Sequence, residues 1–135
     1  GNVVVRSAVN SRTLAARLES SLDAALGFTP RVVTRTAAEL RSALAQNPFP
    51  DADERKLLIG FMTERPSAAS VDTLADFDAS PEEFKIIGSE IYLHYVDGVG
   101  KSRRLARLPL HKLGVEVTAR NLRTVNKLLE MATQR

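Results

Sequence analysis

The stretch EFKIIGSEIYLHYV, residues 83–96, predicts an antiparallel β-hairpin and with it the class of the fold. Its two strand-forming runs flank Gly88-Ser89, a two-residue turn with glycine first, which is typical of a type II′ hairpin. In the second run, Ile91, Leu93 and Tyr95 fall on one face of the strand. We therefore expect antiparallel pairing in the sheet of this protein.

Three further segments upstream of the hairpin have strand composition. Residues 56–62 form a continuous apolar run, which predicts a central strand covered on both faces. Residues 1–7 and 31–35 are short and rich in valine, so we expect a strand in each.

Helices are predicted between these strands. Leucines recur every four residues from Leu14 to Leu26, which indicates a helix over 12–26 that ends at Gly27. Thr36 and Glu39 have the spacing of a capping box, and the helix that they open stops before Asn47-Pro48. Ser70 is expected to cap a short third helix.

The order of these elements predicts an α+β fold, a ferredoxin-like α/β sandwich. We expect a mainly antiparallel sheet with helices packed on one face, plus C-terminal helices. Residues 1–28 are interpreted as the remnant strand and helix of an N-terminal ferredoxin-like half. Residues 29–135 are interpreted as a C-terminal α+β half that ends in basic helices.

Charge is distributed unevenly over the 135 residues. The net charge is +3, but residues 98–135 carry nine Lys/Arg against two Asp/Glu, whereas residues 1–97 carry ten against fourteen. The chain has no cysteine, which excludes disulfides, thiolate metal sites and a cysteine nucleophile. No apolar run approaches the ~18 residues of a membrane span, and the first residues do not have the pattern of a signal peptide. We expect a cytoplasmic protein without a membrane partner.

A glycine-rich turn follows the hairpin and is the first candidate site. Gly98, Gly100, Lys101 and Ser102 resemble the end of a phosphate-binding loop, but Tyr95 stands where a Walker loop needs its first glycine. Two interpretations remain: backbone N–H groups beside Lys101 and Ser102 bind a single anion, or the glycines only form a turn.

The second candidate site is the last helix, predicted to begin with Thr118 as its N-cap. At about 100° per residue, Arg120, Arg123 and Lys127 share one exposed face. Asn121 falls on the packing side, where it is expected to brace the helix start against the 98–102 turn. Pro109 interrupts residues 103–113, so two short turns are expected there.

The sequence gives no basis for a metal or a cofactor. The acidic residues of the loop 49–55 begin like a calcium loop, but the glycine and the distal glutamate of such a loop are missing. The chain has two histidines, and no pair of carboxylates has a setting typical of a general acid and base.

Several pieces of the chain, in order, resemble the bacterial domain of unknown function 1697. These pieces are GNVVV at 1–5, NPF at 47–49, IYL at 91–93, GVGKS at 98–102 and TARNLRTVNKLL at 118–129, so the resemblance extends over essentially the whole chain. Leu122 stands where members often have an aromatic residue. The resemblance implies a fold of ferredoxin-like halves and a further strand and helix ahead of Gly1. It implies no established activity.

Three functions remain open on the sequence alone. The first is a non-enzymatic binding module whose basic C-terminal face meets an anionic partner, with nucleic acid as one candidate; a homodimer is a further partner hypothesis. The alternative is an enzyme acting on a small phosphorylated or anionic substrate through Lys101, Ser102, Arg120 and Asn121. In the third, these residues only brace the fold.

Overall fold

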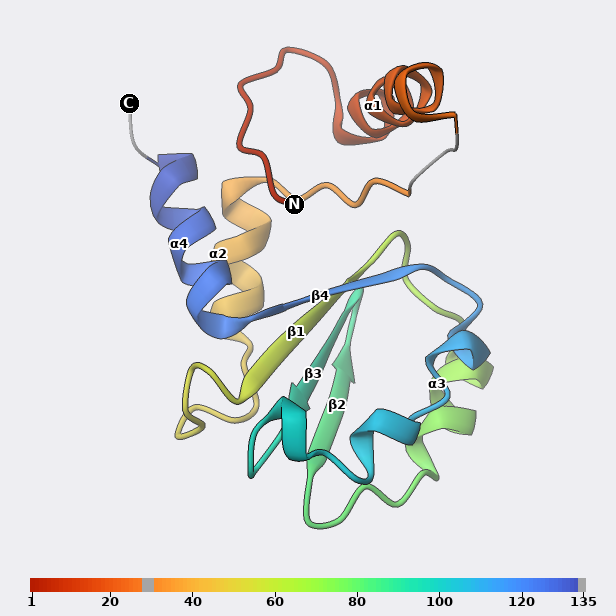
Figure 1. Cartoon of the computed structure of the whole chain (residues 1–135), viewed down its shortest axis with the longest axis vertical. Coiled ribbons are helices and arrows are strands. Elements are labelled where there is room, and N and C mark those ends of the chain that lie inside the picture. Colours follow the sequence, from red (N-terminus) through yellow and green to blue (C-terminus); the bar gives the residue numbers. More distant parts are fainter. Residues whose placement is uncertain (28–30, 134–135) are drawn as a thin grey trace.

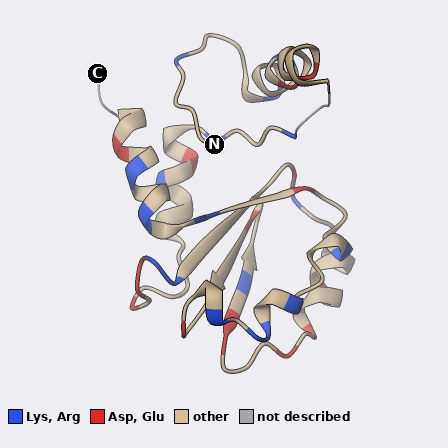
Figure 2. Ribbon diagram, viewed as in Figure 1, with Lys and Arg blue, Asp and Glu red and all other residues tan. Residues whose placement is uncertain are grey.

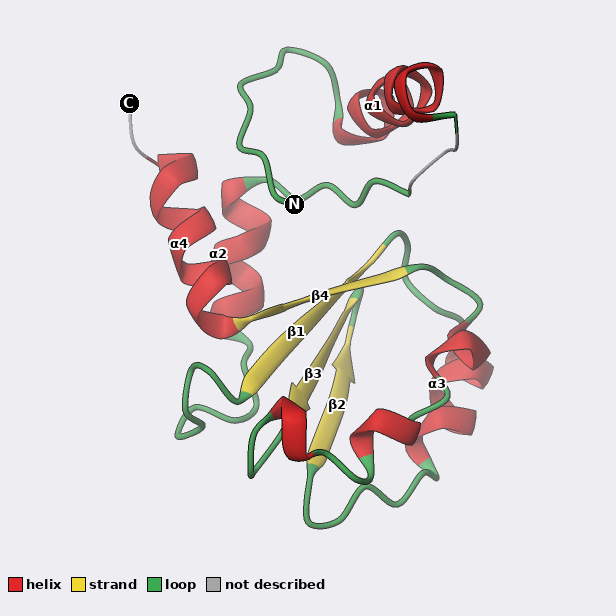
Figure 3. Ribbon diagram, viewed as in Figure 1, coloured by secondary structure: helices red, strands yellow, loops and turns green. Residues whose placement is uncertain are grey.

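The computed structural model describes residues 1–27 and 31–133, and the predicted domain boundary between residues 28 and 29 lies outside them. The described residues form four α-helices, three 3₁₀ turns and one four-stranded antiparallel sheet of order β2-β3-β1-β4 (Figures 1 and 3). The elements are α1 (Ser11–Leu26), α2 (Ala37–Ala45), β1 (Leu57–Met62), α3 (Ala68–Ala75), β2 (Glu83–Ile87), β3 (Glu90–His94), β4 (Val117–Asn121) and α4 (Leu122–Thr133).

The predicted hairpin is confirmed and forms one side of the sheet. Strands β2 and β3 pair from Glu83 opposite His94 to Ile87 opposite Glu90. Gly88 turns between them with a φ of +61°, in the left-handed region that favours glycine. The other edge of β3 pairs with β1, whose far edge pairs with β4.

The two faces of the sheet carry different layers, as the alternation of side chains along β1 requires. Leu57, Ile59 and Phe61 pack under α2 and α4, which lie side by side on one face. Met62 packs on the opposite face, where α3 and the 3₁₀ turns supply Leu74, Leu105, Leu108 and Leu113. The predicted α+β class is confirmed, and so is a central β1 that is covered on both faces. Helices were expected on one face of the sheet, whereas α3 also covers the other face.

Gly60 allows side chains of the two neighbouring strands, β3 and β4, to approach the backbone of β1 closely. A Cβ atom at this position would lie 2.6 Å from Cγ2 of Ile91 on β3 and 2.8 Å from Cγ1 of Val117 on β4. Both neighbours are β-branched and cannot easily rotate away. The single glycine in the apolar run 56–62 is therefore a packing requirement.

The predicted helix caps are largely confirmed. Gly27 ends α1 with a φ of +78°, and Thr36 and Glu39 form the predicted capping box, each side chain accepting from the other residue's backbone N–H. Helix α3 is capped by Ser67 instead of Ser70, because the Ser67 hydroxyl accepts the N–H of Ser70 at 3.2 Å.

The prediction of strands at residues 1–7 and 31–35 was wrong. Neither segment belongs to the sheet, because no strand of the described residues pairs with them. Val3 remains 83% exposed, and α1 between the two segments has no buried residue. Sequences of β-branched residues become strands only where a partner offers a hydrogen-bonding edge.

The prediction of a last helix starting at Thr118 was also wrong. Residues 117–121 form β4, which pairs with β1 from Val117 opposite Met62 to Asn121 opposite Leu58. The helix α4 begins at Leu122, and Asn121 accepts the Thr124 N–H at 2.8 Å in the manner of an N-cap. Pairing with the central strand outweighs the helical spacing of the sequence.

Residues 1–27 and 31–133 contain neither a candidate membrane span nor a candidate metal cluster. No helix in this part of the chain has the length and apolar character needed to span a membrane. The same residues contain no group of three His, Asp or Glu side chains placed to hold a metal ion.

Candidate functional site

The predicted site residues fall into two groups on opposite faces of the sheet. The turn at 98–102 leads into the 3₁₀ segment whose Leu105 and Leu108 pack on the face of α3. Helix α4, with Arg123 and Lys127, packs on the face of α2 through Val125. The expected brace between Asn121 and the 98–102 turn is therefore absent from the described contacts, and Asn121 caps α4 instead.

The glycine-rich turn holds an anion that the sequence did not suggest. One carboxylate oxygen of Glu82, Oε1, accepts the Ser102 hydroxyl at 2.9 Å and the N–H groups of Arg104 at 3.0 Å and Leu105 at 2.9 Å. Burial opposes ionisation of this carboxyl, but these hydrogen bonds hold the pKa of Glu82 below its usual value. The turn has the donors of an anion site, and the protein's own side chain occupies them.

The two glycines of the turn differ in what they contribute. Gly98 has a φ of +93°, which only glycine adopts without strain, and it precedes the 3₁₀ turn Val99–Lys101. Gly100 has no such φ, and a Cβ atom added there would meet no heavy atom within 4 Å. The space around Gly100 therefore does not require glycine.

Arg120 lies on β4 and is partly occupied by contacts within the chain. Its Nε donates to Oδ1 of Asn2 at 2.8 Å, and its Nη1 donates to the carbonyl oxygen of Ala119 at 2.8 Å. The predicted helical face of three cations is therefore wrong, because Arg120 precedes the helix. Arg123 and Lys127 remain one turn apart on α4, both exposed, with Lys127 Nζ 3.8 Å from an exposed Glu130 carboxylate.

The strongest concentration of exposed positive charge is the segment from Gly98 to Val115, which we call the basic segment. It contains no Asp or Glu. Its five Lys and Arg side chains are exposed, and none of them forms an ion pair among the described residues. Figure 2 shows blue ribbon at each of the three 3₁₀ turns of the segment. The five residues are Lys101, Arg103, Arg104, Arg107 and Lys112.

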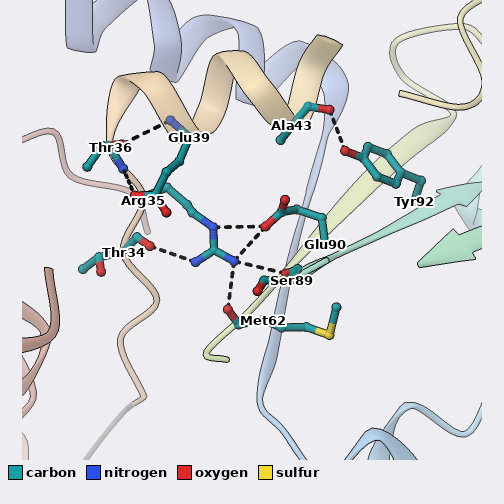
Figure 4. A network of polar contacts seen from close by, with 9 residues as sticks. All are labelled: Thr34, Arg35, Thr36, Glu39, Ala43, Met62, Ser89, Glu90 and Tyr92. Atoms are coloured by element: carbon teal, nitrogen blue, oxygen red, sulfur yellow. Dashed lines mark hydrogen bonds and ion pairs between the residues drawn. The ribbon is translucent and has the colours of Figure 1, made fainter. Parts of the chain in front are cut away.

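A groove of about 600 Å³ lies elsewhere, between α1, the extended residues 31–35, α2 and the turn of the hairpin. Its floor is a polar network around Arg35 (Figure 4). The guanidinium donates to Glu90 Oε2 at 3.0 Å and to the carbonyl oxygens of Met62 at 2.9 Å, Ser89 at 3.1 Å and Thr34 at 2.8 Å. Arg35 thereby fastens the N-terminal segment to the sheet.

Sequence reasoning missed both Glu82 and Arg35. Neither belongs to a motif, and each finds its partners far along the chain. Glu82 meets a turn 20–23 residues away, and Arg35 meets Glu90 at a separation of 55 residues. A second groove of about 410 Å³, lined by Arg31, His111 and Glu116 among others, also contains none of the predicted site residues.

Comparison with solved structures supports the fold. One similar structure is that of the conserved bacterial protein SP0830 from Streptococcus pneumoniae, with a TM-score of 0.68 and 17% sequence identity. The alignment covers 94% of this chain and 73% of that one. Among curated proteins, no relative matches.

Comparison with protein families gives a match at the N-terminal side of the chain. The model described as protein of unknown function (DUF1697) matches residues 1–92, so every residue of the predicted anion site lies beyond the matched part. The site therefore has to be argued from its own geometry. Because the match extends over more than half of the 135 residues, this chain belongs to the DUF1697 family.

Proposed function

We propose that this protein is a non-enzymatic binding module whose basic segment contacts an anionic partner. The observation that carries the proposal is the charge of that segment. Five exposed Lys and Arg side chains lie between residues 98 and 115, without a carboxylate in the same stretch and without an ion pair among the described residues. Such a surface attracts anions over a distance set by ionic strength.

The shape of the segment favours an extended polyanion over a small ligand. Its cations are spread over three successive 3₁₀ turns, and neither described groove includes Lys101, Arg103 or Arg107. Nucleic acid is the candidate that fits this chemistry. Aromatic residues make up only 5% of the chain, so contact is expected through phosphates rather than through stacked bases.

Arg123 and Lys127 form a secondary contact surface in this proposal. They are exposed on α4, on the face of the sheet opposite the buried leucines of the basic segment. A rigid partner that binds one face does not reach the other, so the two surfaces are tested separately. The alternative of an enzyme acting on a small anionic substrate is not favoured by any arrangement around Lys101, Ser102, Arg120 or Asn121.

The test is the salt dependence of binding to a fluorescent single-stranded oligonucleotide of mixed sequence. The variant combines Lys101→Ala, Arg103→Ala and Arg107→Ala. If each side chain neutralises one phosphate, the slope of log K against log salt falls in magnitude by roughly two, from about 0.7 per contact.

The matched control removes three exposed arginines elsewhere through Arg41→Ala, Arg55→Ala and Arg65→Ala. This control has the same net charge as the first variant and is expected to retain the wild-type slope. A second variant, Arg123→Ala with Lys127→Ala, measures the contribution of α4. Equal losses in both triple variants, or no salt-dependent binding by the wild type, would contradict the proposal.

A further inference from the structure

The carboxylate of Glu82 lies against the basic segment and accepts hydrogen bonds from it. The residue is only 8% exposed, and its Oε1 accepts three hydrogen bonds of 2.9–3.0 Å. Two of the donors are consecutive backbone N–H groups, those of Arg104 and Leu105. Consecutive N–H groups that converge on one point form the concave site in which proteins hold anions.

Ser102 connects this carboxylate to the rest of the turn. Its hydroxyl donates to Glu82 at 2.9 Å and accepts the N–H of Ala106 at 3.1 Å. Ser102, Arg104 and Leu105 therefore donate to one oxygen atom of Glu82, and Ala106 is joined to them through the Ser102 hydroxyl. Leu105, inside this turn, is 4% exposed and anchors it to the core.

The cations of the basic segment are attached to this same turn. Arg103 and Arg104 lie within it, Lys101 precedes it and Arg107 follows it. N–H dipoles that point at one place repel each other unless an acceptor lies between them, and a charged carboxylate is a strong acceptor. The Glu82 carboxylate is thus part of the structure that positions these cations.

We propose that Glu82 is the resident anion of the Ser102–Ala106 turn and the positioning residue of the basic segment. The sequence predicted an external anion at the preceding turn, residues 98–102, whereas the side-chain carboxylate is held by Ser102 and by the backbone N–H groups of Arg104 and Leu105. Glu82 holds the backbone of residues 102–106 so that the neighbouring cations face the partner. The part of this inference that concerns partner binding rests on the proposed function. The site in which Ser102, Arg104 and Leu105 hold the Glu82 carboxylate, which we call the cradle, does not depend on it.

Chemical rescue tests the cradle without any partner. Glu82→Ala leaves the Ser102 hydroxyl and the N–H groups of Arg104 and Leu105 without their acceptor, so the melting temperature is expected to fall by roughly 5–10 °C. Formate, the smallest carboxylate, is expected to recover most of this loss, whereas chloride at equal ionic strength does not. The wild type is the control and should not respond selectively to formate, whereas the double variant Glu82→Ala with Ser102→Ala, which keeps the two N–H donors but lacks the hydroxyl, should respond less than Glu82→Ala.

Two outcomes would overturn the cradle: no selective formate effect on Glu82→Ala, or an equal effect on the wild type. If Glu82→Ala does not fold in plain buffer, refolding in formate but not in chloride is the expected result. Failure to refold in either salt counts against the inference.

Oligonucleotide binding by Glu82→Gln tests the positioning role, because positioning and simple electrostatics predict opposite signs. Removing a negative charge beside the basic segment tightens binding if only charge matters. Loss of the resident anion weakens binding several-fold if the charge orders the turn. Asp78→Asn is the matched control, since Asp78 is exposed and its pKa is lowered chiefly by hydrogen bonds from Ser80 and also by the nearby charge of Arg104.

We expect Asp78→Asn to bind slightly more tightly and Glu82→Gln to bind more weakly than the wild type. Tighter binding by both variants would overturn the positioning role while leaving the proposed function intact. Absence of oligonucleotide binding by the wild type would remove the proposed function and with it the positioning role, and the formate experiment would still decide the cradle.

Discussion

Residues 1–27 and 31–35 differ strongly in burial from residues 36–133, although their apolar patterns are similar. The N-terminal region contains the regular leucine spacing of α1 and two valine-rich segments, and yet α1 has no buried residue. In the second region, Leu57, Ile59 and Tyr92 are fully buried between layers. Apolar residues of the same kinds are thus partly or largely exposed in the N-terminal region and fully buried in the second region.

The difference between the regions is the presence of a partner surface. Strands β1, β3 and β4 supply hydrogen-bonding edges and faces to each other, whereas residues 1–7 and 31–35 pair with no strand in the described part of the chain. Periodicity sets the type of an element, because one helical face or one strand face must be apolar. Burial and pairing depend on what lies opposite, which a local pattern does not contain.

A pair of leucine substitutions measures this difference with the largest expected effect. Leu57→Ala removes a fully buried side chain and is expected to lower the free energy of unfolding by about 2–5 kcal/mol. Leu22→Ala, on the exposed side of α1 with 37% exposure, is expected to change it by less than about 0.5 kcal/mol. Urea denaturation of both variants gives the comparison. A cost at Leu22 similar to that at Leu57 would mean that α1 is covered in solution.

Arg35 joins the two regions, and its replacement is expected to have an intermediate effect. The side chains of Arg35 and Glu90 are 13% and 14% exposed, so Arg35→Gln leaves a largely buried carboxylate without its charged partner and removes the guanidinium donors to three carbonyl oxygens. We expect a loss of about 2 kcal/mol, with faster hydrogen exchange and proteolysis at residues 31–34.

The matched control for Arg35 is Arg31→Gln. Arg31 is 61% exposed and lies 3.7 Å from Glu19, so its removal is expected to cost under about 0.5 kcal/mol. If both substitutions accelerate exchange in the N-terminal region equally, Arg35 is not the fastening point that its hydrogen bonds indicate.

The elements that sequence reasoning predicted well are those whose signals are local. The Gly88-Ser89 turn, the capping box at Thr36 and the apolar run of β1 each contain their cause within a few residues. Strand β4 was missed because its residues, TARN, have helical spacing with the residues that follow, and only the edge of β1 makes them a strand. Long-range pairing was the information that the local pattern lacked.

The exposure of several proposed site residues agrees with the sequence, but their arrangement differs from the expected one. Lys101, Arg123 and Lys127 are exposed as expected, whereas Asn121 caps α4 on the far face from the turn. Nothing in the local sequence connects Glu82 to Ser102, because the chain returns to Glu82 only after completing the hairpin. Charge is visible in a sequence, but the partner of a charge depends on the fold.

Substitution of Tyr92 is expected to change the free energy of unfolding least. It reports only on the second region, because the chain's two tyrosines are Tyr92 and Tyr95. The Tyr92 hydroxyl donates to the carbonyl oxygen of Ala43 at 2.6 Å, and burial, with the nearby charge of Glu90, raises the pKa of Tyr92 to about 12. A raised pKa favours the neutral phenol in the folded protein. The resulting stability is complete below the usual pKa of 10.0 and is lost as the pH rises toward about 12.

Tyr92→Phe is therefore expected to cost about 1 kcal/mol at neutral pH and to lose less stability than the wild type between pH 10 and 12. Urea denaturation at a series of alkaline pH values measures both quantities. Because residues 1–35 contain no tyrosine, a change in this alkaline dependence reports the junction of β3 with α2 and not the N-terminal region. An identical alkaline dependence in the variant and the wild type would mean that the Tyr92 hydroxyl is open to water, and that this junction is as loosely covered as α1.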